Sequence, residues 1–183
     1  MMSYLTDSVG EQQWKNMEPL DLNLGDSNNS PSYESFTPVT NMKLYGFKDA
    51  NTMTEIFCIF EIPHDYKPGT DMRPHIHWTP HDDTGGNVKW QFSYSIADNG
   101  LPFTAMKTIS AIDSADGKNL YYSKEFDPVI SGEGITGGAV IVARLFRDPT
   151  DPDDTYAGIA KLLTIGIHYQ SALLGSVGVF VNE

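Results

Sequence analysis

The amino-acid sequence predicts an all-β protein: a jelly-roll-type antiparallel sandwich of about eight strands with an extended N-terminal arm. Three observations support this fold class. Residues 87–96 alternate strictly between apolar and polar side chains, which is the period of a half-buried strand and not of a helix. Further apolar runs follow along the chain, separated by turn segments rich in Gly, Asp and Pro. No segment combines a helical period with capping residues, so we expect no helical layer.

Residues 1–40 form the predicted arm, and residues 41–183 form the predicted sandwich domain. The arm is polar and rich in Asn, Ser, Asp and Pro, a composition that cannot build a core of its own. It also suits a leader without fixed structure, because chain termini are often loose. We expect isolated apolar side chains to dock the arm onto its own domain or a neighbouring subunit. These predicted anchors are Trp14, Leu20, Leu22 and Leu24.

Eight segments after residue 41 are predicted as strands from their apolar content and the turn residues that flank them. Residues 54–62 and 139–146 are apolar on both faces, as expected of strands covered on two sides. In residues 161–170, one face carries Leu163 and the apolar side chains that follow it, and the other carries Leu162 and the polar side chains. In chain order the predicted strands cover residues 42–47, 54–62, 72–79, 87–96, 104–111, 120–126, 139–146 and 161–170.

Composition and charge restrict the classes of function. The 183 residues, 40% of them apolar, suffice for one domain with a sizeable core. A formal net charge of −12 repels nucleic-acid phosphates and anionic lipid headgroups. No apolar run reaches the roughly 20 residues of a membrane span, and the N-terminus shows no secretory signal. We therefore expect a soluble protein, made in a reducing cytoplasm, that binds neither nucleic acid nor membrane.

The single cysteine excludes an intrachain disulfide framework and cysteine-based zinc clusters. Cys58 lies between apolar neighbours, which predicts a buried and inert thiol.

The segment of residues 61–78 is the most informative one, because it contains a His-x-His pair of the kind found in metal sites. Side chains alternate between the two faces of a strand, so Ile76 and Trp78 share one face while His75 and His77 share the other. The large apolar pair must face the core, and both histidines are therefore expected to point away from it. We expect the polar faces of two strands to meet in a patch near a subunit contact. Its predicted members are Arg73, His75, His77 and His168.

An alternative interpretation makes these histidines metal ligands. Gly69 followed by the His75-x-His77 pair resembles the opening of the first cupin motif, in which the histidines point into a barrel and hold a divalent metal. A cupin-like metalloenzyme would use His75, His77 and His168. This sequence departs from the cupin pattern in two respects. His81 or Asp82 stands at the position where the first cupin motif has a glutamate. His168 lacks the neighbouring residues that define the second cupin motif. We therefore expect no metal and no other cofactor.

Other chemistry finds little support in the sequence. There is no Gly-x-Ser-x-Gly nucleophile elbow, and we predict no catalytic residue. The acidic loop of residues 147–156 offers oxygen ligands suited to calcium, but it lacks the EF-hand spacing. The better interpretation is a rigid loop in which Arg147 pairs with Asp148 or Asp154.

A set of short motifs resembles a known family. The motifs are residues 60–70, Pro74–Trp78, Trp90-x-Phe-x-Tyr94, Ala143–Asp148, Asp154–Tyr156, Ile167–Tyr169 and Leu174–Ser176. Together they resemble small virion-associated proteins of tailed bacteriophages, over most of residues 54–176. The resemblance implies a β-sandwich component of the virion without catalytic activity.

The combined expectation is a non-enzymatic phage structural protein, most simply a capsid decoration (cement) protein that stabilises the head shell. It would be assembled in the host cytoplasm and reside in the virion. Its partners would be phage capsid or tail proteins and further copies of itself, with a homotrimer favoured because closed homo-oligomers are the usual arrangement. A tail or fibre-associated structural protein is the alternative within the same class, and the cupin-like metalloenzyme is the alternative from a different class.

Overall fold

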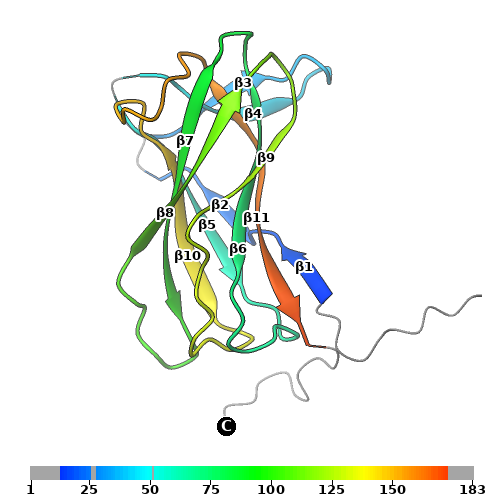
Figure 1. Cartoon of the computed structure of the whole chain (residues 1–183), viewed down its shortest axis with the longest axis vertical. Helices are drawn as coiled ribbons and strands as arrows, with labels where there is room; N and C mark the ends of the chain where they lie inside the picture. The colour runs from blue at the N-terminus through cyan, green and yellow to red at the C-terminus, as the bar shows by residue number, and fades with distance from the viewer. Residues whose placement is uncertain (1–12, 26–27, 51, 173–183) are drawn as a thin grey trace, which may run out of the picture.

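The computed structural model describes residues 13–25, 28–50 and 52–172, which fold into two packed antiparallel sheets that run along the long axis of the molecule (Figure 1). Eleven strands and no helix occur in these residues. The strands are β1 Gln13–Met17, β2 Asp21–Asn23, β3 Ser32–Ser35, β4 Lys43–Phe47, β5 Thr54–Glu61, β6 Arg73–Pro80, β7 Gly86–Ala97, β8 Lys107–Ala115, β9 Tyr122–Glu125, β10 Val140–Arg147 and β11 Ala160–Ser171.

The topology is that of a jelly roll. One sheet has the order β3-β4-β11-β6-β9, with β1 also pairing with β11, and the other has the order β2-β5-β10-β7-β8. If the eight strands from β4 to β11 are counted from one to eight, the two sheets contain strands 1-8-3-6 and 2-7-4-5. This is the double Greek-key arrangement of the jelly roll, with neighbouring strands drawn from distant parts of the chain. The predicted all-β fold class is confirmed, and all eight predicted strands are present.

The core lies between the sheets and is rich in aromatic side chains. Trp78 of β6 and Trp90 of β7 are fully buried, with ring centroids 5.9 Å apart in an edge-on arrangement. Phe47 also packs edge-on against Trp90, with a centroid distance of 5.0 Å. Aromatic pairs in such geometry contribute beyond the area they bury. The alternating side chains of β7 thus supply the centre of the core.

Three strands come from the segment predicted as an arm. β1 pairs with β11 from Gln13↔Ser171 to Met17↔Ile167, β2 pairs with β5, and β3 pairs with β4. Residues 13–40 therefore add edge strands to both sheets, while residues 1–12 lie outside the described residues. Of the predicted anchors, Leu22 and Leu24 pack against the core cluster, whereas Trp14 and Leu20 are 45% and 68% exposed.

A β-bulge in β11 changes the predicted facing of its first residues. The pairing register with β6 shifts between Leu162 and Thr164, so Leu163 is the extra residue. Leu162 is consequently buried in the core together with Ile165 and Ile167, and Leu163 lies at the partly exposed surface. The prediction that grouped Leu163 with the apolar face of this strand was wrong at this one residue, and it was right from Ile165 onward.

The acidic loop after β10 is held by a buried ion pair. Arg147 is fully buried and donates from Nε and Nη2 to the two carboxylate oxygens of Asp154, at 2.9 and 2.7 Å. Its Nη1 group donates to the backbone carbonyls of Phe47 and Gly158 at 3.1 and 2.7 Å. Bidentate arginine–carboxylate pairs are strong and geometrically specific. The predicted pairing of Arg147 is confirmed with Asp154, and the loop is tied to both sheets.

Candidate functional site

The strand that carries the His-x-His pair is oriented as predicted. Ile76 and Trp78 are fully buried in the core, and His75 and His77 lie on the opposite, outer face of β6. β11 pairs alongside in a register that sets His168 opposite Arg73 and Gly166 opposite His75. The polar faces of two strands far apart in the sequence therefore meet, and the four residues predicted as a patch form one cluster.

The three imidazoles of this cluster are in direct contact. The rings of His75 and His168 are stacked with centroids 4.0 Å apart, and His77 meets His75 edge-on at 4.9 Å. His75 is only 3% exposed, and its Nδ1 atom is buried without a hydrogen-bond partner among the described residues. Burial, reinforced by His168 and His77, lowers the pKa of His75 to about 4. Burial also lowers the pKa of His77, against the opposing effect of Glu18. His75 is therefore neutral at ordinary pH.

Strand β1 covers one side of the cluster. A Cβ atom at Gly166 would lie 2.7 Å from Oδ1 of Asn16 and 3.0 Å from Cε1 of His75, so a larger residue there would force the Asn16 side chain to move. Thr164 donates a hydrogen bond to Glu18 at 2.9 Å. The guanidinium of Arg73 lies 5.4 Å from the centre of the Trp14 ring, within cation–π range. A predicted arm anchor and the predicted patch thus belong to one surface.

The opposite margin of the cluster is formed by β9 and the residues before it. The hydroxyl of Tyr121 and Nδ1 of His77 share a hydrogen bond, and their rings stack at 5.5 Å. Glu125 lies 3.3 Å from Arg73 and 3.9 Å from Nδ1 of His168. We call this surface the imidazole face. It consists of Trp14, Arg73, His75, His77, Tyr121, Glu125 and His168.

The imidazole face does not have the form of a metal centre. The cupin pattern requires histidines that point into the interior, whereas these rings are on the outer face and two of them are stacked on each other. Within residues 13–25, 28–50 and 52–172, no group of three or more His, Cys, Asp or Glu side chains is arranged to hold a metal ion. In the acidic loop, Asp151 and Asp153 both lie 2.9 Å from the ammonium group of Lys89. These carboxylates already have a cationic partner in the protein.

Asp65 is a structural centre that the sequence did not reveal. Its carboxylate accepts hydrogen bonds from Tyr169 at 2.9 Å and from Ser171 at 2.7 Å, and it forms an ion pair with Lys15 of β1. Burial acts to raise the pKa of Asp65, but the hydrogen bonds from Lys15, Ser171 and Tyr169 outweigh it, and the net pKa is lowered. Asp65 thereby fastens β1, β11 and the loop after β5 to one another.

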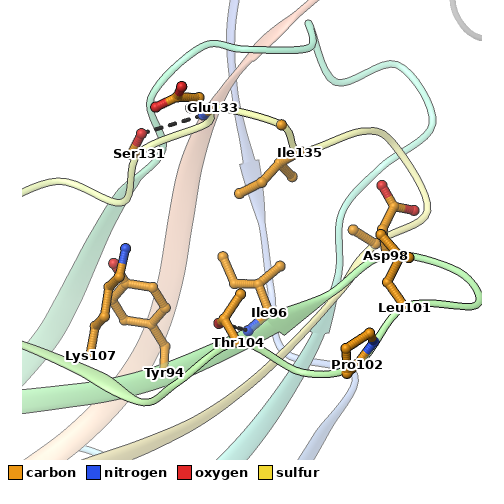
Figure 2. A pocket seen from close by; sticks show the side chains of 12 residues that line it. Tyr94, Ile96, Asp98, Leu101, Pro102, Thr104, Lys107, Ser131, Glu133 and Ile135 are labelled. Atoms are coloured by element: carbon orange, nitrogen blue, oxygen red, sulfur yellow. Dashed lines mark hydrogen bonds between the residues drawn. The ribbon is translucent and has the colours of Figure 1, made fainter.

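A separate cleft opens at the end of the sandwich, between the β7–β8 connection and the loop that precedes β10 (Figure 2). It encloses about 280 Å³. Tyr94, Thr104 and Lys107 lie on one side, and Ser131, Glu133 and Ile135 on the other (Figure 2). No sequence motif pointed to this cleft, because its walls come from loops distant in the chain.

Comparison with known proteins finds matches among solved structures alone. No family model matches it, and no curated protein matches it. Among solved structures, a CBM35 from Cellvibrio japonicus Abf62 aligns over 89% of this chain and all of its own, at 11% identity and a TM-score of 0.42. The CBM22-1–GH10 modules of a Clostridium thermocellum endo-1,4-beta-D-xylanase 10B, complexed with xylohexaose, align over 88% of this chain and 29% of their own, at 8% identity and a TM-score of 0.34. Neither likeness is close enough to support a functional assignment.

Within the part of the chain that the structure describes, no helix has the length and apolar character needed to cross a bilayer.

Proposed function

We propose that this chain is a non-enzymatic structural protein of a tailed-bacteriophage virion, a capsid decoration protein that acts by surface contact. The imidazole face carries the proposal. Its polar and aromatic side chains lie across β1, β11, β6 and β9 on the outer surface of a sheet. An open sheet surface suits docking onto another protein, whereas catalysis requires groups that converge on a bound substrate.

The motifs that resemble phage virion proteins also support the proposal, because their residues have structural duties here. Arg147 and Asp154 form the buried ion pair, and Tyr169 bonds to Asp65. Trp78 and Trp90 form the centre of the core. None of these side chains is left exposed to attack a substrate.

Two aromatic rings are the expected contact points of the imidazole face. Trp14 is 45% exposed and Tyr121 is 63% exposed, one at each margin of the face. Tyrosine, tryptophan and arginine are the side chains most often responsible for binding energy at protein interfaces. Arg73, stacked near Trp14, adds a third such group.

The experiment compares incorporation of variants into virions. Trp14→Ala and Tyr121→Ala should each reduce incorporation, whereas Tyr33→Ala, which removes a ring of similar exposure (57%) on β3, should not. Deleting residues 1–40 is a poorer test, because it removes three strands of the folded domain. Equal incorporation of all three point variants would contradict the role of this face.

A tail or fibre position is the second candidate, favoured by the exposed rings of Trp14 and Tyr121. Such rings next to the hydrogen-bonding groups of Arg73 and His168 also suit a sugar surface. Labelling the protein in intact particles distinguishes the two positions: label on the head supports decoration, and label on the tail supports the alternative. A homotrimer is part of the decoration proposal, and light scattering of the purified protein measures it directly.

A further inference from the structure

The cleft at the end of the sandwich contains a tyrosine hydroxyl that has no partner in the fold. Tyr94 of β7 lines the cleft, and its ring is packed in the core cluster with only 5% of the residue exposed. Its hydroxyl oxygen is not sealed off and opens toward the cleft. Within the part of the chain that the structure describes, this hydroxyl neither donates nor accepts a hydrogen bond, and burial raises the pKa of Tyr94. Burying a hydroxyl without a partner costs free energy, so the cleft offers a ligand a donor that the protein does not use.

A lysine stands directly beside this hydroxyl. Lys107, the first residue of β8, is the cross-strand partner of Tyr94, and Figure 2 shows the two side chains next to each other on one wall of the cleft. No acidic side chain of the described residues forms an ion pair with Lys107. An O–H and an ammonium group side by side match the two oxygens of a carboxylate, and hydrogen bonds to a charged acceptor are stronger than neutral ones.

The facing wall carries the opposite charge. Glu133 lies there in a turn in which its backbone amide donates to the hydroxyl of Ser131 at 3.3 Å (Figure 2). Its carboxylate has no cationic partner among residues 13–25, 28–50 and 52–172. Asp98, the other acidic residue of the cleft, differs in this respect, because its two carboxylate oxygens accept from the Thr136 hydroxyl at 2.6 Å and from the Asn99 amide at 2.8 Å. Glu133 is therefore the acidic group available to a cation in the cleft.

The size and the apolar lining of the cleft restrict the ligand further. Ile96 and Ile135 both line the cleft and belong to or pack against the core cluster, so the middle of the cleft is apolar. Its volume of about 280 Å³ lies just below the roughly 300–1,000 Å³ of typical small-molecule sites. A formal net charge of −12 disfavours a ligand that carries negative charge alone. These properties together select a small molecule that has an apolar body and charged groups of both signs.

We propose that the cleft binds a small zwitterion with an apolar body, of the class of the apolar α-amino acids. The carboxylate of the ligand accepts hydrogen bonds from the Tyr94 hydroxyl and the Lys107 ammonium group. Its own ammonium group approaches Glu133, and its apolar side chain lies against Ile96 and Ile135. The site is independent of the imidazole face, which lies on β1, β11, β6 and β9 of the other sheet.

An NMR titration of the full chain with three related probes tests the proposal. The probes share a phenyl ring: L-phenylalanine carries both charges, 3-phenylpropanoate lacks the ammonium group, and 2-phenylethylamine lacks the carboxylate. L-phenylalanine should shift the backbone amide resonances of Ile96 and Ile135 in a saturable way. Loss of the carboxylate should weaken binding by about tenfold or more, because it removes hydrogen bonds to a charged group. Loss of the ammonium group should weaken it by about threefold, as for an exposed ion pair.

Matched variants identify the groups that hold the ligand. Tyr94→Phe removes only the hydroxyl and should weaken binding of L-phenylalanine by about tenfold. Its control is Tyr33→Phe, which removes a hydroxyl that bonds to Tyr45 on the other sheet and should leave binding unchanged. Lys107→Met should also weaken binding, whereas Lys124→Met on β9 should not.

Three results would overturn the proposal. The first is the absence of saturable shifts at Ile96 and Ile135 with L-phenylalanine. The second is equal binding of all three probes, which would mean that the cleft recognises only an apolar ring. The third is unchanged binding in both Tyr94→Phe and Lys107→Met, with circular dichroism verifying that each variant folds. None of these results bears on virion incorporation, so the proposed function is tested separately.

Discussion

Replacing His75 with glutamine should remove a pH-dependent part of the protein's stability. In the folded protein this imidazole is 3% exposed, and burial together with His168 and His77 lowers its pKa to about 4, from an ordinary value of 6.5. As the pH falls, the unfolded chain therefore takes up a proton at this position before the folded protein does. The associated stability is fully present above pH 6.5 and is lost progressively as the pH falls toward 4.

The size of the effect follows from these two pKa values. At pH 8 both states are neutral at this position, and at pH 5 the unfolded imidazole is mostly protonated while the folded one is not. The free energy of unfolding should then fall by about 2 kcal/mol between pH 8 and pH 5 through His75 alone. His77, whose pKa burial also lowers, adds to the loss in the same direction.

Urea denaturation followed by far-ultraviolet circular dichroism, at pH 8 and pH 5, measures the effect. The informative quantity is the difference between wild type and His75→Gln in the stability lost over this interval, because groups away from the histidine cluster titrate equally in both proteins. His64→Gln, which removes an imidazole whose side chain is 43% exposed, is the control for the loss of a surface imidazole. The same loss in His75→Gln and in the wild type would refute the buried, neutral state of His75.

Three further predictions concern the elements that support the imidazole face and the core. Asp154→Ala leaves the buried Arg147 guanidinium without its carboxylate and should lower the free energy of unfolding by roughly 3–5 kcal/mol. Asp153→Ala, which loses only a partly exposed ion pair, should cost less than about 1 kcal/mol in the same urea titration. Gly166→Ala should push the Asn16 side chain aside and shift the proton resonances of the His75 ring in an NMR spectrum, and an unchanged His75 spectrum would contradict the close packing at Gly166. The thiol of Cys58 should react with a chromogenic disulfide reagent only after unfolding, and rapid labelling of the native protein would show that it is not buried.

The jelly roll was predictable because several of its strands show a clear pattern of their own. Strict alternation marks β7, and apolar residues on both faces mark β5 and β10, which both lie inside a sheet. The facing of β6 was also predictable, since Ile76 and Trp78 are too large and apolar to remain outside the core. That single orientation placed the histidines on the outer surface before any pairing was known.

The three N-terminal strands could not be predicted from their own residues. β1, β2 and β3 are short, and their side chains are mostly exposed or partly exposed. They form strands because β11, β5 and β4 offer edges with unpaired backbone groups, which is a property of the tertiary fold. The β11 bulge escaped prediction for a related reason, since alternation assumes a constant register and Leu163 breaks it.

The polar contacts were predictable only where the geometry of one short loop decides them. Asp148 is adjacent to Arg147 in the chain, but its carboxylate accepts a hydrogen bond from the backbone amide of Thr150. Asp154 is therefore the bidentate partner of Arg147. Asp65 joins residues more than a hundred positions apart in the chain, so no local pattern signals it. The cleft beside Leu101 is likewise created by two loops that meet only in the folded molecule.

The placement of the three tryptophans gives the protein an internal optical reporter. Trp78 and Trp90 are sealed in the core, and Trp14 alone has solvent on its indole ring. A soluble quencher such as iodide should therefore quench the fluorescence of Trp14 and leave the fluorescence of Trp78 and Trp90 unchanged. When a partner covers the face on which Trp14 sits, that quenching should vanish and the spectrum should shift to the blue, so docking can be followed on the unlabelled protein.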